Sequence, residues 1–271
     1  MVLTSRFRLD CRSFQHDEHL LLTSHADVAQ QLTSALTLPQ PPLAITFSDE
    51  PLGGTSPVTP VPAGCSFWEW ASRQTLSTTA SDHQHCAIGV HTHNLRDAVA
   101  EHGSELEAAL GAMTGLGYVT ADEVAAIPVM QDSQTYVTYG PLADTDHTPS
   151  VVLLIADGAQ SLTLSEAVAR VDRGLPPALG RPACALIPQV ANSGAAAASL
   201  GCCGARAYVD SLSRDIVLWG LPGDKLSAYA DTIETLANAN ATLSLFHTKR
   251  REAIETGETP TVQDSLAALG G

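Results

Sequence analysis

The stretch "VVLLIA" at residues 151–156 decides the fold class. A short, unbroken run of apolar residues predicts a strand that is buried on both faces. A few residues later, Thr163 and Glu166 have the spacing of a capping box, which predicts the start of a helix. Leu164 and Val168 lie on one face of that helix. A buried strand followed by an amphipathic helix indicates a sheet that is covered by helices.

Elements of both kinds continue on either side of this strand. We expect helices from Ser24, over residues 96–110 and after Thr120. Strands are expected at residues 43–47 and in the segments "YVTYG" and "DIVLWGLP". The sequence therefore predicts an α/β or α+β fold, a single layered domain around a mixed β-sheet flanked by helices.

The domain boundaries follow from where the periodic pattern begins and ends. Residues 1–24 carry little periodicity and are expected to form an N-terminal arm. Residues 25–255 are expected to form one α/β domain, and residues 256–271 a loose C-terminal tail. The sequence shows no internal repeat.

The composition limits the expected partners and compartment. Acidic residues number 29 against 14 basic ones, which gives a formal net charge of −15. Such a surface repels phosphate backbones and anionic lipids, so neither nucleic acid nor a membrane is expected as a partner. The N-terminus has no signal-peptide pattern, and no stretch approaches the roughly 18 apolar residues of a membrane span. We therefore expect a cytoplasmic protein whose six cysteines stay reduced.

Cysteines in loop-like surroundings are candidates for a metal site. Cys65, Cys86 and Cys184 are far apart in the chain, and Cys202 and Cys203 lie between two glycines in "SLGCCGARAY". None of them forms a C-x-x-C pair, which argues against a zinc ribbon. Four distant thiolates that meet in space are the usual ligands of iron–sulfur clusters. Taken singly, each cysteine is also compatible with a small, buried apolar residue.

A histidine-rich segment surrounds the second of these cysteines. The segment "HQHCAIGVHTH" places His83, His85, His91 and His93 around Cys86. Imidazole binds zinc, copper, iron and nickel, so these histidines are alternative, less favoured metal ligands. The competing interpretation is that they are ordinary half-exposed histidines without a ligand.

Several segments together resemble an uncharacterised prokaryotic family, the domain-of-unknown-function family number one hundred and sixty-nine. The resemblance runs from about residue 27 to residue 240. It is carried by the segments "LPQPPLAITFSDEP", "GCSFWEWAS", "HQHCAIGV", "SVVLLIADGAQSLTLSEAV", "GRPACALIP", "SLGCCGARAY" and "DIVLWGLPGDKL". The cysteines at positions 65, 86, 184 and 202 fall where the family pattern places cysteines, and Cys203 fills a variable position.

The resemblance implies a shared metal site on Cys65, Cys86, Cys184 and Cys202, with an iron–sulfur cluster such as [4Fe–4S] as the expected cofactor. In the turn that carries the last cysteine, it implies three cofactor-binding residues. These are Gly201, Gly204 and Arg206, with the glycines admitting a close approach of the backbone and the arginine balancing charge.

We therefore predict a metal-binding protein with a redox or lyase-type role on an unidentified small molecule, or with a redox partner. Zinc, another transition metal or haem are the alternative cofactors. Two further classes stay open. One is a metal-free thiol catalyst that uses Cys86 or Cys202 with a histidine, and the other is a binding or sensor protein with a structural zinc.

Overall fold

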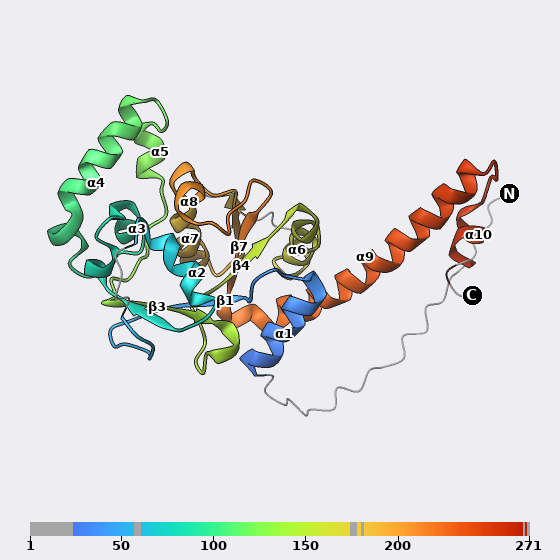
Figure 1. The fold of residues 1–271 in the computed structure, drawn as a ribbon, viewed down its shortest axis with the longest axis horizontal. Helices are drawn as coiled ribbons and strands as arrows, with labels where there is room; N and C mark the ends of the chain where they lie inside the picture. The colour runs from blue at the N-terminus through green and yellow to red at the C-terminus, as the bar shows by residue number, and fades with distance from the viewer. Residues whose placement is uncertain (1–23, 57–60, 174–177, 180–181, 268, 270–271) are drawn as a thin grey trace.

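The structure is a computed structural model that describes residues 24–56, 61–173, 178–179, 182–267 and 269. The expected N-terminal arm therefore lies outside the described residues, apart from Ser24. A seven-stranded sheet in the order β2-β3-β1-β4-β7-β6-β5 forms the centre of the protein (Figure 1). Its strands are β1 (Leu43–Ser48), β2 (Leu76–Thr78), β3 (Tyr136–Pro141), β4 (Val151–Ala156), β5 (Ala178–Leu179), β6 (Ala197–Ser199) and β7 (Val217–Pro222).

Helices cover both faces of the sheet. The neighbouring strands are antiparallel except β5 and β6, which makes the sheet mixed and confirms the predicted fold class. The α-helices are α1 (His25–Leu36), α2 (Phe67–Ala71), α3 (Ala87–Thr92), α4 (Ala98–Gly115), α5 (Ala121–Ala125), α6 (Gly158–Val171), α7 (Leu186–Ser193), α8 (Cys203–Tyr208), α9 (Leu226–Glu255) and α10 (Val262–Ala267). No helix in the described ranges has the length and apolar character needed to cross a membrane.

Alternation along the strands divides the core into two layers. Leu43, Ile45 and Leu153 pack with α2 and α7 on one face of the sheet. The intervening side chains, such as Val152 and Leu154, pack with α1, α6 and α9 on the other face. The sheet is therefore the middle layer of a three-layer arrangement, and the strand at residues 151–156 is buried on both faces as predicted.

The helix after β4 begins earlier than its sequence pattern predicts. Asp157 accepts the Gln160 backbone N–H at 2.8 Å, and the Gln160 side chain accepts the Asp157 N–H at 2.7 Å. This reciprocal pair caps α6 at Gly158, so Thr163 is an interior residue of α6. The helices expected from Ser24 and after Thr120 are confirmed, and each begins with a capping box.

The sheet contains a structural repeat that was not expected from the sequence. β1 pairs with β3 with Leu43 opposite Pro141, and β4 pairs with β7 with Val151 opposite Pro222. β2 then joins β3, and β6 joins β7, in equivalent registers. The order β1-β2-β3 in the first half thus corresponds to β4-β6-β7 in the second. The expectation of no internal repeat is wrong, because the repeat lies in backbone pairing rather than in side-chain identity.

The two halves are related by a pseudo-two-fold axis. Where β1 meets β4, Leu43 faces Leu153, Ala44 faces Val152 and Ile45 faces Val151 in an antiparallel ladder. Residues 43–45 correspond to residues 151–153, so exchanging the halves leaves this pairing unchanged. The axis therefore passes between the central residues of the two short segments, at the middle of the sheet.

Insertions break this symmetry, and the longest one connects α3 to β3. In the second half, residues 209–216 connect α8 directly to β7. In the first half, residues 93–135 connect α3 to β3 and contain α4 and α5. These two helices stand out from one end of the molecule, opposite the end from which α9 projects (Figure 1). We call α4, α5 and the residues between them the α4–α5 arm.

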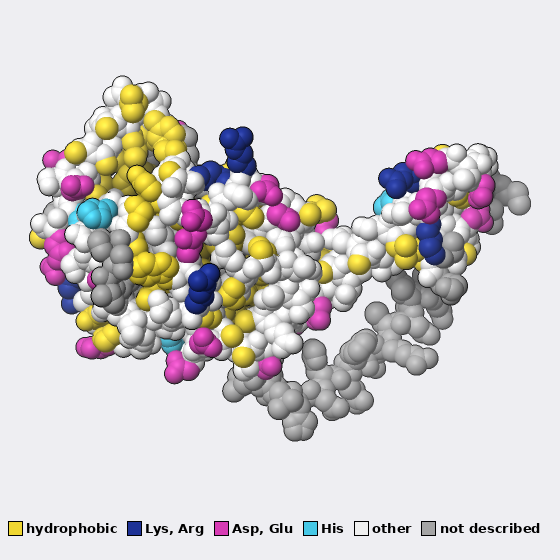
Figure 2. Space-filling model, viewed as in Figure 1, with side chains coloured by type: hydrophobic (Ala, Val, Ile, Leu, Met, Phe, Trp, Pro, Cys, Tyr) yellow, Lys and Arg dark blue, Asp and Glu magenta, His cyan; other side chains and the backbone are white. Residues whose placement is uncertain are grey.

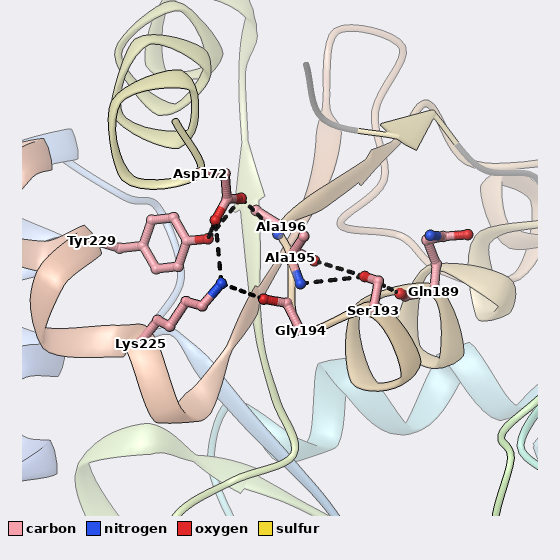
Figure 3. A network of polar contacts seen from close by, with 8 residues as sticks. All are labelled: Asp172, Gln189, Ser193, Gly194, Ala195, Ala196, Lys225 and Tyr229. Carbon is pink, nitrogen blue, oxygen red and sulfur yellow. Dashed lines mark hydrogen bonds and ion pairs between the residues drawn. The ribbon is translucent and has the colours of Figure 1, made fainter. Parts of the chain in front are cut away.

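A polar network connects the end of α6 with its neighbours, in the layer that contains α1, α6 and α9 (Figure 3). The buried Asp172 carboxylate accepts the Tyr229 hydroxyl at 2.8 and 2.9 Å and the Ala196 backbone N–H at 3.1 Å. Lys225 lies 3.5 Å from the same carboxylate and donates to the Gly194 carbonyl at 2.5 Å. One side chain thus connects α6, the start of β6 and α9.

Candidate functional site: a four-cysteine cavity

The four candidate cysteines occupy equivalent places in the two halves. Cys65 is the middle residue of the 3-10 turn η1 (Gly64–Ser66) before α2, and Cys184 is the middle residue of η4 (Ala183–Ala185) before α7. Cys86 is the N-cap of α3, and Cys202 is the N-cap of α8. The structural repeat therefore delivers two equivalent pairs of cysteines, each at the beginning of a helical segment.

The two halves interlock around these cysteines. The turn η1 contacts α8 of the other half, and η4 contacts α3. Ser66 donates its hydroxyl to the Tyr208 carbonyl at 3.2 Å across this junction. Each half thus places one cysteine against an element of the other half, so that the site is formed by both.

All four cysteines line one cavity of about 430 Å³. Cys203 and His85, both exposed, also line it, together with Gly204. The α4–α5 arm forms part of its wall. The described cysteines are free thiols, and the other thiol of the chain, Cys11, lies outside the described residues.

Burial and mutual repulsion disfavour the charged form of the thiols. Burial, followed by the negative charges of Cys86 and Cys202, raises the pKa of Cys65. Burial and then the charge of Cys86 raise the pKa of Cys184 well above its ordinary value. The pKa of Cys86 is raised by burial and also by the charge of Cys202. These couplings indicate that the four sulfur atoms are close enough to interact electrostatically.

Backbone N–H groups donate to the sulfurs of both N-cap cysteines. The Ala205 N–H donates to the Cys202 sulfur at 3.4 Å. The N–H groups of Gly64 and Gly89 donate to the Cys86 sulfur and lower its pKa against the larger effect of burial. Ala205 and Gly89 stand three residues after their cysteines, so this donor is also part of the repeat.

Behind the cysteines lies a set of buried polar side chains. Nδ1 of His83, both ring nitrogens of His93 and the hydroxyl of Tyr139 have no hydrogen-bond partner among the described residues. The ring centroid of His83 lies 6.3 Å from that of His93 and 6.4 Å from that of Tyr139. Unsatisfied buried donors and acceptors of this kind are uncommon and indicate a missing partner.

This polar set adjoins the cysteines. A Cβ atom placed on Gly64 would lie 2.6 Å from His83 Nδ1 and 3.8 Å from the Cys86 sulfur, so both atoms face the same glycine. Burial, and then the charges of Cys86, Cys65 and Cys184, raise the pKa of Tyr139. Polar groups of His83 and Tyr139 that have no hydrogen-bond partner among the described residues therefore lie next to the four-cysteine site.

The remaining candidates take other positions. Arg206 donates to the backbone carbonyls of Leu200, Leu212, Ser213 and Ile216, and it thereby holds the loop on both sides of α8. Gly201 has a φ of +79°, which allows the sharp turn before Cys202. His91 is exposed on α3. Within the described ranges, no three His, Cys, Asp or Glu side chains already stand in an arrangement that holds one metal ion.

Replacing Gly89 by alanine is expected to destabilise the protein. The added methyl group would lie 2.7 Å from the Cys86 sulfur, and we expect it to lower the free energy of unfolding by about 2 kcal/mol. Gly111→Ala on α4 is the matched control, since a Cβ there meets open space; it should raise stability by up to about 1 kcal/mol. Chemical denaturation measures both, and equal gains in the two variants would contradict the close packing around Cys86.

The buried histidines predict a loss of stability in mild acid. Burial, and then the charge of His93, lowers the pKa of His83 to about 3, and burial lowers the pKa of His93 to about 4. Between these values and the unfolded value of 6.5, the unfolded chain binds protons that the folded chain does not.

The contribution of these two histidines to the stability of the metal-free protein should therefore be constant above pH 6.5 and fall with decreasing pH, by about 1.4 kcal/mol per pH unit for each histidine. His83→Gln should reduce this slope by one proton. Denaturation series between pH 7 and about pH 4.5 test the expectation. An unchanged slope in the variant would show that His83 is not buried in its neutral form.

The fold and the site define a class of protein, a three-layer α/β protein whose duplicated core carries a four-cysteine cavity. The chain belongs to the DUF169 family, described as uncharacterised ArCR, whose pattern matches residues 31–232. The match includes both halves of the repeat and all four cysteines, and it confirms the resemblance seen in the sequence. No curated protein and no solved structure matches the chain.

Proposed function

We propose that Cys65, Cys86, Cys184 and Cys202 bind an iron–sulfur cluster, and that the protein uses it in redox or lyase-type chemistry on a small molecule in the adjoining cavity. The observation that carries the proposal is the convergence of two equivalent cysteine pairs on that one cavity. Four cysteine thiolates are the usual ligand set of [2Fe–2S] and [4Fe–4S] clusters.

The chemistry of the thiols supports a bound cationic group. Cys65, Cys86 and Cys184 have raised pKa values, and such neighbouring thiols do not ionise together unless a positive charge compensates them. A nucleophilic cysteine needs the opposite, a lowered pKa and a cationic neighbour. The neutral, buried His83 does not supply that charge. A metal-bearing cofactor is therefore better supported than a metal-free thiol catalyst.

The size of the cavity favours a cluster over a single zinc ion. A structural zinc draws its four ligands to about 2.0–2.3 Å from one point. The four cysteines here line a cavity of about 430 Å³. A cluster occupies more space between its ligands and fits this arrangement better. We propose [4Fe–4S] as its type, with zinc and other metals as alternatives to be tested.

The other residues at the site have roles that follow from their hydrogen-bonding capacity. The backbone N–H groups of Ala205 and Gly89 donate to ligand sulfurs, and the unpaired groups of His83 and Tyr139 are available to do the same from the inner side. Hydrogen bonds to sulfur and exclusion of water tune the reduction potential of such a centre. When bound, a cluster supplies one-electron transfer, or a Lewis-acidic iron if one position is open to substrate.

The test is the iron and acid-labile sulfide content of the full chain, purified without oxygen, with its visible spectrum. Equal amounts of iron and sulfide with a brown colour are expected. Protein that contains zinc without iron or sulfide would contradict the cluster and indicate a structural zinc site. A colourless protein without any metal, even after reconstitution with iron and sulfide, would overturn the proposal. In that case, alkylation of Cys86 and Cys202 would test the thiol catalyst.

A further inference from the structure

The α4–α5 arm is the part of the cavity that the structural repeat does not explain. It is inserted in one half alone, and it lies over the face on which both halves present their cysteines. Figure 2 shows apolar side chains gathered along this arm and on the body of the protein beneath it. The repeat alone is enough to place the four cysteines. The arm, which is present in one half only, therefore indicates a further role for the cavity.

We propose that this cavity binds an uncharged, largely apolar small molecule against the four cysteines. The inference adds a substrate class to the proposed function. It rests on the proposed function only for the cluster that the bound molecule would contact. Binding itself depends only on the walls of the cavity. The argument has three parts, which concern the lining, the charge and the size of the cavity.

The lining is apolar on both sides. The arm contributes Ala109, Leu110 and Met113 from α4, and Ile127 lies two residues after the end of the arm. The body contributes Ala183 from η4 and the half-exposed ring of Tyr208 from α8. An apolar molecule that enters between them removes apolar surface of the protein from water, which favours binding by roughly 25 cal/mol per Å².

The charges at the cavity exclude anions. Glu105 and Glu123 are its charged lining residues in the described part of the chain, where no Lys or Arg lines it. Glu123 already accepts the Thr120 backbone N–H at 2.9 Å, in the cap of α5. Thiolate ligands on the cavity floor would add negative charge, and the whole chain carries a net charge of −15. A carboxylate, phosphate or sulfonate would be repelled and would also lose its hydration.

The size of the cavity selects a small molecule over a protein segment. A volume of about 430 Å³ lies within the range of roughly 300–1,000 Å³ typical of ligand pockets. The walls come from both the arm and the body, so they enclose a ligand rather than offering one flat face. A second copy of the chain docked on the arm is the rival occupant, and the test includes it.

Two dyes with the same ring system test the inference. N-phenyl-1-naphthylamine is uncharged, and 8-anilinonaphthalene-1-sulfonate adds a sulfonate. Titrations of the full chain followed by fluorescence should show saturable binding of the uncharged dye, at least about tenfold tighter than the sulfonate. Equal or tighter binding of the sulfonate would overturn the inference.

Matched variants on α4 locate the binding. Ala109→Trp fills the cavity and should weaken binding of the uncharged dye by about tenfold or more. Ser104→Trp adds the same ring at an exposed position on the opposite side of α4 and should leave binding unchanged. Met113→Trp repeats the test if Ala109→Trp does not fold, as judged by circular dichroism. Dye binding that is insensitive to the cavity variants overturns the inference.

Two further measurements separate the outcomes. Sedimentation of the chain with and without Ala109→Trp detects a dimer through the arm, and a dimer that excludes the dye overturns the inference. The titrations are run on metal-free protein and on protein reconstituted with iron and sulfide. Expected dye binding without any metal uptake overturns the proposed function alone. Full metal uptake with equal binding of both dyes overturns the cavity inference alone.

Discussion

Replacing Cys65 or Cys184 by serine should abolish the proposed metal binding, and the two replacements should have the same effect. The two residues occupy equivalent turns before α2 and α7, and burial raises the pKa of both thiols. A serine hydroxyl at either position is a much poorer ligand for iron than a thiolate. Iron and sulfide should therefore fall to background in both variants, while the far-ultraviolet circular dichroism keeps the form seen for the unmutated chain.

The N-cap cysteines offer a sharper comparison with an internal control. Cys202→Ser should empty the site, because the Cys202 sulfur faces the cavity and accepts the Ala205 N–H. Cys203→Ser should retain iron and sulfide, because that thiol is exposed at the first position of α8. The reverse result, with the site lost only when Cys203 is replaced, would assign the ligand to the neighbouring sulfur.

Removing the Asp172 carboxylate should strongly destabilise the protein. Asp172→Ala leaves the Tyr229 hydroxyl and the Ala196 N–H without their buried acceptor and separates Lys225 from its ion-pair partner (Figure 3). We expect the free energy of unfolding to fall by about 3 kcal/mol, the usual cost of breaking a buried polar network. Urea denaturation with an unchanged slope measures the loss.

Two variants bracket this prediction. Tyr229→Phe removes one donor and leaves the carboxylate its other partners, so a loss of about 1 kcal/mol is expected. Asp144→Ala removes an exposed carboxylate and should change the stability by less than about 0.5 kcal/mol. A loss in Asp172→Ala no larger than that in Tyr229→Phe would show that the network contributes through one bond alone.

The elements were predictable from the sequence wherever a local signal exists. The apolar run at residues 151–156 and the capping boxes at Ser24 and Thr120 are local, and each forms the expected element. The start of α6 was missed because Asp157 and Gln160 form a cap as strong as the one inferred at Thr163. Both pairs fit the pattern, and only the position of the preceding strand decides between them.

The cysteines that line the cavity could be predicted from the sequence, whereas the residues around them could not. The candidates at 65, 86, 184 and 202 line one cavity, and the family pattern had singled them out. The sequence also contained a signal for the repeat, since two pairs of cysteines each precede a helix at similar separations. Tyr139 and the arm gave no such signal, because their place beside the cysteines comes from strand order and a long insertion.

The pseudo-two-fold axis makes this chain comparable to a homodimer fused into one polypeptide. Either half alone would contain two of the four thiols. Its central strand, β1 or β4, would be an unpaired edge of the sheet. Two copies of one half, joined through that edge, would restore both the sheet and a set of four thiols. Such a symmetric pair would carry the arm either twice or not at all, and two arms would compete for one cavity mouth. Covalent fusion is therefore what permits a single arm beside the four thiols.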